Sequence, residues 1–262
     1  MLFRSDDSLV QAIGADIRNE TSVSLAVAGA GAVVNAVSLY VERGKDTFHA
    51  LHVDCARRLA SEAQRAGVEE FVHISGIGAE PTSRSPYIRS RGEGESAVRA
   101  AFPAAVLIRP AVMFAPDDAF ITLILKLLRR SPIYPVFGSG KTRLQPVHAD
   151  DVAEAVARVV SRAEAEPSTF ECGGPRVYTY QEFLRSIARE VGLKPALVPV
   201  PFAVWYGLAR AAEILPNPPI ARNQVELMQI DSVTSSALPG LPDLGIVPQP
   251  AEAIVRSLVG PR

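Results

Sequence analysis

The sequence predicts an α/β protein in which helices cover both faces of a parallel sheet. Two observations lead to this fold class. In the first half of the chain, short β-branched runs typical of buried strands alternate with longer segments of helical periodicity. Of the 262 residues, 48% are apolar and 21% are charged, which is ordinary for a globular protein with a full core. A repeated order of strand, helix and strand implies strands that run in one direction.

The first half contains three predicted strands and two predicted helices. The helix spanning 46–67 places Phe48, His52 and Cys55 on one stripe and ends at Gly67, which we expect to cap it. The second helix spans 87–102. The strands are "AVVNAV" (32–37), "FVHIS" (71–75) and "AVLIRP" (105–110).

The second half is richer in proline and predicts a smaller lobe. Helices are expected over 117–130, from Asp151 with Asp150 as N-cap, and from Thr179, where Glu182 completes a capping box. "TFECGG" (169–174) is expected to be a short strand. We therefore expect a sheet domain over 1–173 and a smaller lobe over 174–262, packed on the first and partly interleaved with it. The amphipathic segment 202–215 could offer a partner or membrane-proximal surface, but packing against the core is favoured.

Charge and cysteine content narrow the functional classes. The net charge is −1, which gives no bulk electrostatic reason to expect nucleic acid or an anionic membrane as partner. Cys55 and Cys172 are the only cysteines and form no disulfide or zinc pattern, so a reducing, cytoplasmic setting is expected. No apolar run reaches the roughly 20 residues that a membrane span needs.

Two glycine-rich stretches do not fit nucleotide-binding motifs. "GSGKT" (138–142) has Pro135 where the phosphate-loop pattern needs glycine, so a turn is expected there. The glycines of "GAGAVVNAVS" (29–38) precede a strand, whereas the dinucleotide fingerprint follows one. A helix end, a central strand and a polar exit explain this stretch. Residues 35–38 of that exit could line a ligand site beyond the end of the strand, or they could form a plain polar turn.

Two acidic segments allow functional and structural interpretations. Asp16 could cap a helix that begins near Asn19, or this segment could meet an adenine edge. For Asp150 and Asp151, N-capping and the helix dipole are favoured over metal binding, and we expect no metal site. His148 is expected to be structural, with lining of a pocket as the alternative.

Ser75, Tyr87 and Arg91 make the sharpest chemical pattern. Ser75 ends a predicted strand, and Tyr87 and Arg91 are one helical turn apart on the same face. Hydride transfer between a nicotinamide and a carbonyl uses such a set: a serine orients the substrate oxygen, a tyrosine transfers the proton, and a cation holds the ribose. These residue types are common, however, and an ordinary polar surface is the more frequent explanation.

The order of the motifs resembles the extended or atypical short-chain dehydrogenase/reductases, a superfamily of Rossmann-type proteins that includes NAD-dependent epimerases and dehydratases. "YIRSRGEGE" resembles the Tyr-x-x-x-Lys helix, "GADIRNETSV" the strand end beside adenine, and "LIRPAVMFAPDD" the loop over the nicotinamide. Within the superfamily, "TRLQPVHADDVAEAV" and "TFECGGPRVYTYQEFL" are most similar to bacterial relatives of the NADPH-binding accessory subunit of respiratory complex I. The resemblance implies catalytic roles for Ser75, Tyr87 and Arg91, and contacts with NAD or NADP by Asp16, Ile17, Asn35, Ala36, Val37, Ser38, Tyr87, Arg91, Pro110 and Met113.

Two departures from the family pattern shape the functional expectation. The Gly-rich loop and its strand, which bind the pyrophosphate in the family, are not found, so we expect an N-terminally truncated chain with an impaired nucleotide site. Arg91 stands where reductases carry lysine, which favours gripping a ligand over turnover. We therefore expect an NAD(P)-binding accessory protein with weak or no catalysis, held at the inner membrane through complex I subunits. The alternatives are an active reductase, epimerase or dehydratase, and a fragment that binds no nucleotide.

Overall fold

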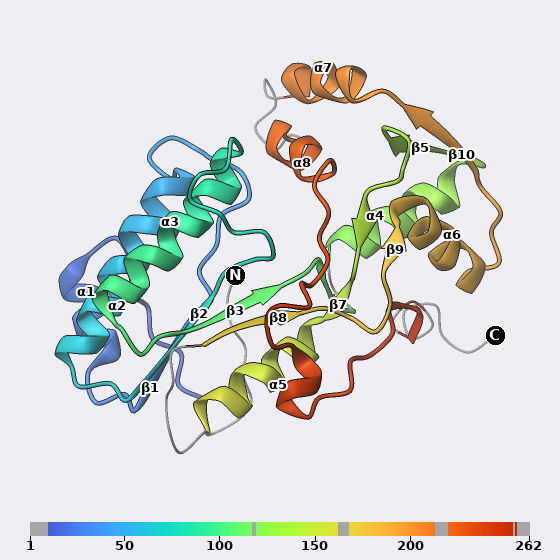
Figure 1. Cartoon of the computed structure of the whole chain (residues 1–262). Coiled ribbons are helices and arrows are strands. Elements are labelled where there is room, and N and C mark those ends of the chain that lie inside the picture. The colour runs from blue at the N-terminus through green and yellow to red at the C-terminus, as the bar shows by residue number, and fades with distance from the viewer. Residues whose placement is uncertain (1–9, 117–118, 162–167, 213–219, 254, 256–262) are drawn as a thin grey trace.

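A four-stranded parallel sheet forms the centre of the computed structural model, which describes residues 10–116, 119–161, 168–212, 220–253 and 255 (Figure 1). Its strand order is β1-β2-β3-β8, and every neighbouring pair is parallel. This arrangement confirms the expected Rossmann-type α/β fold. The strands are β1 (Ala32–Asn35), β2 (Glu70–Ile74), β3 (Val106–Pro110) and β8 (Thr169–Cys172).

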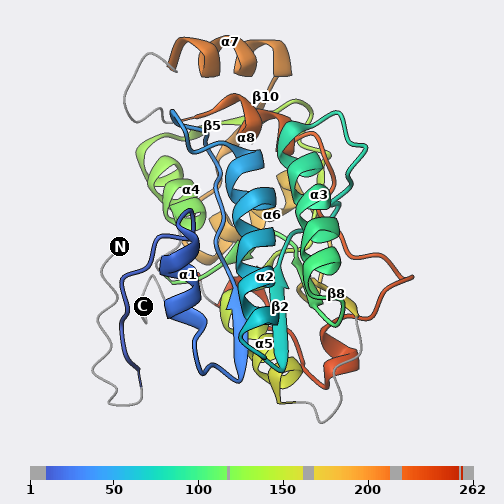
Figure 2. The same cartoon turned by 90° about the vertical axis from the view of Figure 1, so that its left-hand side faces the viewer.

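Helices cover both faces of this sheet. Figure 2 shows α1 (Glu20–Val27), α2 (Ala56–Arg65) and α3 (Pro86–Ala101) side by side in front of it. Alanines of α2 pack with Phe71 and Phe102 on this face, and their small side chains let the helix approach closely. On the opposite face, α5 (Ala149–Val160) packs Val152 and Val159 against Val72 and Ile108.

The segment before β1 folds largely as its sequence predicts. The side chain of Asn19, rather than Asp16, caps α1 by accepting a hydrogen bond from the Ser22 amide. Gly29 then turns the chain with a φ of +75°, a conformation that favours glycine. The expectation that β1 is a central strand was wrong for the described residues, because β1 pairs only with β2 and Val34 is 42% exposed. The strand also ends early, because the Asn35 side chain accepts a hydrogen bond from the Val37 amide.

The second half of the chain builds a smaller group of elements around its own core. The helices α4 (Ala119–Arg130) and α6 (Tyr180–Glu190) pack together, and β5 (Ile133–Phe137) pairs in parallel with β10 (Ala196–Val200). The capping box of Thr179 and Glu182 is present as predicted. Apolar residues from 114 to 255 form this core, so it draws on both sides of residue 173. The remaining elements are β4 (Met113–Phe114), β6 (Arg143–Leu144), β7 (Val147–His148), β9 (Tyr178–Thr179), α7 (Phe202–Ala212), α8 (Arg222–Leu227) and the 3-10 helix η2 (Leu241–Leu244).

Two further expectations for this half are corrected by the structure, the first fully and the second in part. The N-cap of α5 is His148 rather than Asp150, because the buried imidazole Nδ1 accepts the Asp150 amide at 3.0 Å. Helix α7 follows the favoured core packing only in part. Trp205 packs on Phe137 with 4.2 Å between the ring centroids and Ala209 is buried, whereas Val204 and Leu208 are about half exposed. Residues 213–215 of that stripe lie outside the described part of the chain.

The "GSGKT" segment forms a turn after β5, as predicted. Gly138 and Gly140 have φ angles of +54° and +67°, which only glycine adopts easily. A Cβ on either residue would also collide with a neighbouring side chain. Among the described helices, none is long and apolar enough to cross a membrane.

Candidate functional site

The carboxyl ends of β1 and β2 meet α3 through Arg91, and most of the predicted site residues lie at the strand ends or in the first turns of α3. In doubly wound sheets, ligands bind at this edge. Ser38 follows β1, Ser75 follows β2, and Pro110 ends β3. The fold therefore brings together side chains that are far apart in the sequence.

Arg91 is the centre of this region. Its guanidinium donates to the Tyr87 hydroxyl at 3.1 Å and to the Ile74 carbonyl at 3.1 Å, and also to the Ser38 hydroxyl. The side chain is only 5% exposed, and its Nε finds no partner among the described residues. Arg91 thus ties α3 to the ends of β1 and β2, while its Nε donor has no partner in the described part of the chain.

Tyr87 is held by aromatic neighbours. The Tyr40 ring stacks on it at 5.8 Å between centroids, and the rings of Phe48 and His52 meet it edge-on at 5.4 Å and 5.5 Å. Tyr87 is 8% exposed, so an ordinary polar surface does not explain Tyr87 and Arg91. This packing fixes the tyrosine ring and directs its hydroxyl towards Arg91.

A short chain of hydrogen bonds supports Tyr87 from behind. The Nε2 of His52 accepts the Leu39 amide at 3.0 Å, so Nδ1 carries the proton and donates to the Ser90 hydroxyl at 2.9 Å. Ser90 in turn donates to the Tyr87 carbonyl at 2.9 Å. Burial, helped by the charge of Arg91, lowers the pKa of His52 to about 3 and keeps the ring neutral.

A second neutral histidine lies below the strand ends. Asn35 accepts the Val37 amide through its oxygen, so its NH2 group donates to Nδ1 of His73 at 3.1 Å. Burial and the Arg91 charge lower the pKa of His73 to about 3. His52 was expected only as part of the stripe of the helix over 46–67, and no role was predicted for His73. A histidine inside the apolar run "FVHIS" was the available signal for the second one.

Ser75 is the group best suited to contact a ligand atom. Its amide donates to the Ile108 carbonyl at 2.8 Å, which fixes the backbone, and it is 3% exposed. Its hydroxyl has no partner among the described residues. Buried hydroxyls are nearly always hydrogen-bonded, so a free one at a strand end indicates a missing partner.

The other residues predicted to contact the ligand differ in their exposure and in their backbone hydrogen bonds. Ala36 and Val37 are exposed after β1, and Met113 in β4 is 39% exposed. The Pro110 carbonyl accepts the Ile77 amide at 3.1 Å, which places it beside the segment after Ser75. Met113 pairs with Val147 of β7, and the contacts of all these positions with a ligand stay predictions.

Asp16 and Ile17 stand apart from this hydrogen-bonded group. Asp16 is exposed and pairs with Arg18, which lowers the pKa of its carboxyl. The Ile17 carbonyl accepts a hydrogen bond from Arg58 at 3.1 Å. Within the described ranges, no hydrogen bond joins either residue to Arg91 or Tyr87, and their adenine role stays a prediction. No group of three or more metal-binding side chains occurs among the described residues.

The arrangement joins a buried cation, a fixed phenol and a free serine hydroxyl at the ligand-binding edge of a parallel sheet. A sequence profile of the NAD dependent epimerase/dehydratase family matches residues 3–173. The chain belongs to this family. It also resembles the family's known members over most of its length, as the motifs indicated.

Three comparisons illustrate the relationship. NADH dehydrogenase [ubiquinone] 1 alpha subcomplex subunit 9, mitochondrial, of Rattus norvegicus is 31% identical over 239 residues, which are 90% of this chain and 63% of the relative. The ceramide reductase of Caulobacter vibrioides is 31% identical over 198 residues, which are 74% of this chain and 61% of the relative. The structure of a triphenylmethane reductase of Citrobacter sp. complexed with NADP(H) matches 93% of this chain and 81% of its own, with a TM-score of 0.73 and 18% identity. The chain spans about three fifths of the length of these curated relatives.

Proposed function

We propose that this protein binds the nicotinamide end of NAD or NADP at the Arg91 site and acts as an accessory partner of a respiratory NADH dehydrogenase, with little or no turnover. Membership of the NAD dependent epimerase/dehydratase family and the likeness to the rat complex I subunit support this proposal. The observation that carries it is the arginine at position 91, hydrogen-bonded to Tyr87, Ser38 and the end of β2.

Each residue has a role in holding the dinucleotide. Arg91 and Tyr87 would bind the ribose hydroxyls of the nicotinamide half, and the exposed backbone of 36–38 would line the ribose. Pro110 and Met113 would lie against the nicotinamide, and the free Ser75 hydroxyl would meet a ligand oxygen. Asp16 and Ile17 would contact the adenine. The bound nicotinamide would supply hydride-transfer chemistry.

Weak turnover follows from the nature of a guanidinium. It spreads its charge over a plane, whereas the lysine ammonium of reductases is a compact charge that reorients freely. Three protein oxygens accept hydrogen bonds from the terminal nitrogens of Arg91 and fix the guanidinium, and its Nε and one further N–H have no acceptor among the described residues and stay available to a ligand. This geometry favours a fixed grip on the ligand and does not favour support of a proton transfer at Tyr87. Attachment to complex I subunits would hold the protein at the inner membrane.

The test combines nucleotide binding with partner capture. The melting temperature of the full chain should rise with added NADPH or NADH, because a ligand that binds only the native state stabilises it. Arg91→Gln should abolish this shift, and Tyr87→Phe should keep most of it. Purification of the full-length natural protein should recover bound nucleotide and NADH dehydrogenase subunits. A cooperative melt that neither nucleotide shifts would reject binding and favour a nucleotide-deficient fragment.

A second candidate function is an active NAD(P)-dependent reductase, epimerase or dehydratase that acts on a small carbonyl or sugar-nucleotide substrate. The free hydroxyl of Ser75 favours this function, because a serine that orients a substrate must have its hydroxyl free to hydrogen-bond the substrate oxygen. The ceramide reductase relative supports carbonyl reduction in particular. Oxidation of NADPH in the presence of carbonyl compounds, lost in Tyr87→Phe while the thermal shift persists, would establish this function in place of the accessory role.

A further inference from the structure

The outward face of α4 has a composition that its packing does not require. Its inward residues, Ile121, Ile124, Leu125 and Leu128, are buried in the core of the second half. The outward face still carries Leu123 and Leu127, which are 48% and 40% exposed. Because the inner stripe already anchors the helix, these two leucines contribute little to folding.

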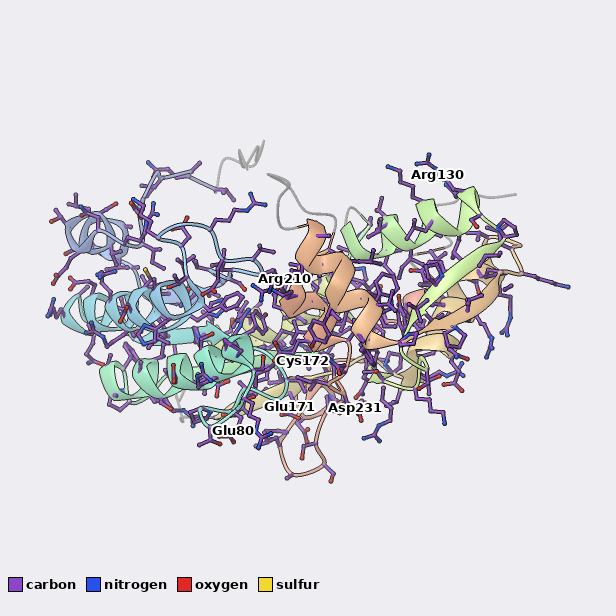
Figure 3. All side chains as sticks on the ribbon, turned by 90° about the horizontal axis from the view of Figure 1, so that it is seen from above. Glu80, Arg130, Glu171, Cys172, Arg210 and Asp231 are labelled. Carbon is purple, nitrogen blue, oxygen red and sulfur yellow. The ribbon has the colours of Figure 1, made fainter. Side chains whose placement is uncertain are left out.

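Four cations lie on or next to the same face. Lys126 lies between the two leucines along α4, and Arg129 and Arg130 follow them at its end. Lys194 approaches the end of the helix from the segment before β10. None of the four forms an ion pair with another described residue. Figure 3 shows Arg130 at the end of α4, pointing away from the molecule. With a net charge of −1 over the whole chain, this is a local concentration of positive charge.

Two hollows open between these cations. One, of about 240 Å³, is lined by Arg129, Arg130, Ser131 and Lys194 together with Leu128 and prolines. The other, of about 380 Å³, is lined by Thr122, Leu125, Lys126, Arg129 and Arg130. Each hollow is thus lined by at least three positive side chains together with at least one apolar side chain.

We propose that this face of α4 binds the anionic headgroup surface of a lipid bilayer. Lysine and arginine side chains bind lipid phosphates, and leucines between them enter the glycerol and acyl boundary. A single-stranded nucleic acid would need aromatic side chains for base stacking, and the described outward face of α4 has none. The proposal is independent of the dinucleotide site, because no residue of this face belongs to it.

Vesicle sedimentation tests the proposal with the full chain. The protein should sediment with vesicles of phosphatidylcholine and phosphatidylglycerol and remain in solution with phosphatidylcholine alone. Raising the salt from about 0.1 M to about 1 M should release it, because screening shortens the reach of the charges. Inorganic phosphate, added at constant ionic strength, should not release the protein. Phosphate can compete for the cations, but it cannot replace the contact of the leucines with the bilayer.

Variants locate the binding face. Arg129→Glu with Arg130→Glu should weaken binding at least roughly 30-fold, the factor for two lost cations. Arg57→Glu with Arg185→Glu changes the net charge equally, at exposed arginines on α2 and α6, and should bind nearly as the parent does. Leu123→Asn with Leu127→Asn tests insertion without any change of charge and should also reduce binding.

Three results would overturn the proposal. One is equal sedimentation with both vesicle types. Another is an equal loss of binding in the two arginine pairs, which would show that net charge alone controls it. The third is unchanged binding in the Leu123 and Leu127 variant, which would show that the leucines do not enter the bilayer and that charge alone holds the protein to the vesicle. Melting temperatures measured for every variant separate loss of binding from loss of folding.

Discussion

Gly94→Ala tests the close contact that positions the site helix. A Cβ on Gly94 would lie 2.2 Å from the His52 carbonyl oxygen, whereas ordinary contacts begin at 3.4 Å. Helix α3 or the π-helix η1 (His49–Cys55) would have to move by more than an ångström. Such overpacking costs about 1–3 kcal/mol. Alanine regains about 1 kcal/mol of helix propensity, so a net loss of up to about 2 kcal/mol is expected.

Gly207→Ala is the matched control. Gly207 lies within α7, and a Cβ there would meet nothing within 4 Å. It should therefore gain up to about 1 kcal/mol through propensity alone. Urea unfolding followed by circular dichroism measures both variants, and the melting temperature should change by roughly 2–4 °C per kcal/mol. If Gly94→Ala were as stable as Gly207→Ala, the contact with His52 would not limit the approach of α3.

Two further predictions concern buried polar groups. Arg109 binds the buried carboxylate of Glu95 at 2.8 Å, and Arg109→Met leaves that carboxylate without its charge partner. The variant should lower the free energy of unfolding by about 3–5 kcal/mol. A loss below about 1 kcal/mol in urea unfolding would contradict this expectation. The pKa of His73 is about 3 in the native chain and 6.5 in the unfolded chain. Between these pH values the unfolded chain binds a proton at His73 and the native chain does not. Stability should therefore fall as pH drops below 6.5, by up to about 1.4 kcal/mol per pH unit for this group. His52 has an equally lowered pKa and adds its own loss of stability over the same pH range. His73→Gln should therefore remove the His73 share of the pH dependence and leave that of His52, and an unchanged profile would show that His73 is protonated in the native state.

Features set by neighbouring residues could be predicted from the sequence. The β-branched runs around Val72 and Ile108 formed central strands because both of their faces are apolar. The capping box at Thr179 formed because it needs only a glutamate three residues later. Tyr87 and Arg91 share a face for the same reason, since helical geometry alone brings them together.

Features decided by distant contacts could not be predicted. The cap of α5 is His148 because packing against Phe114 buries its ring at the helix start, which neighbouring residues do not reveal. The aromatic packing around Tyr87 depends on Tyr40, a residue of a loop with no distinctive motif. The site therefore combines a local pair that the sequence indicates with supports that only the tertiary structure supplies.

The outer side of β8 is closed by a late part of the chain. The Ser235 amide donates to the Glu171 carboxylate, 64 residues earlier, and the Glu171 amide donates to the Pro239 carbonyl. During synthesis, β8 therefore leaves the ribosome well before the segment that covers it. Its free edge is available to other strands in that interval, so a nascent chain stalled before residue 235 should depend on chaperones more than the finished chain does.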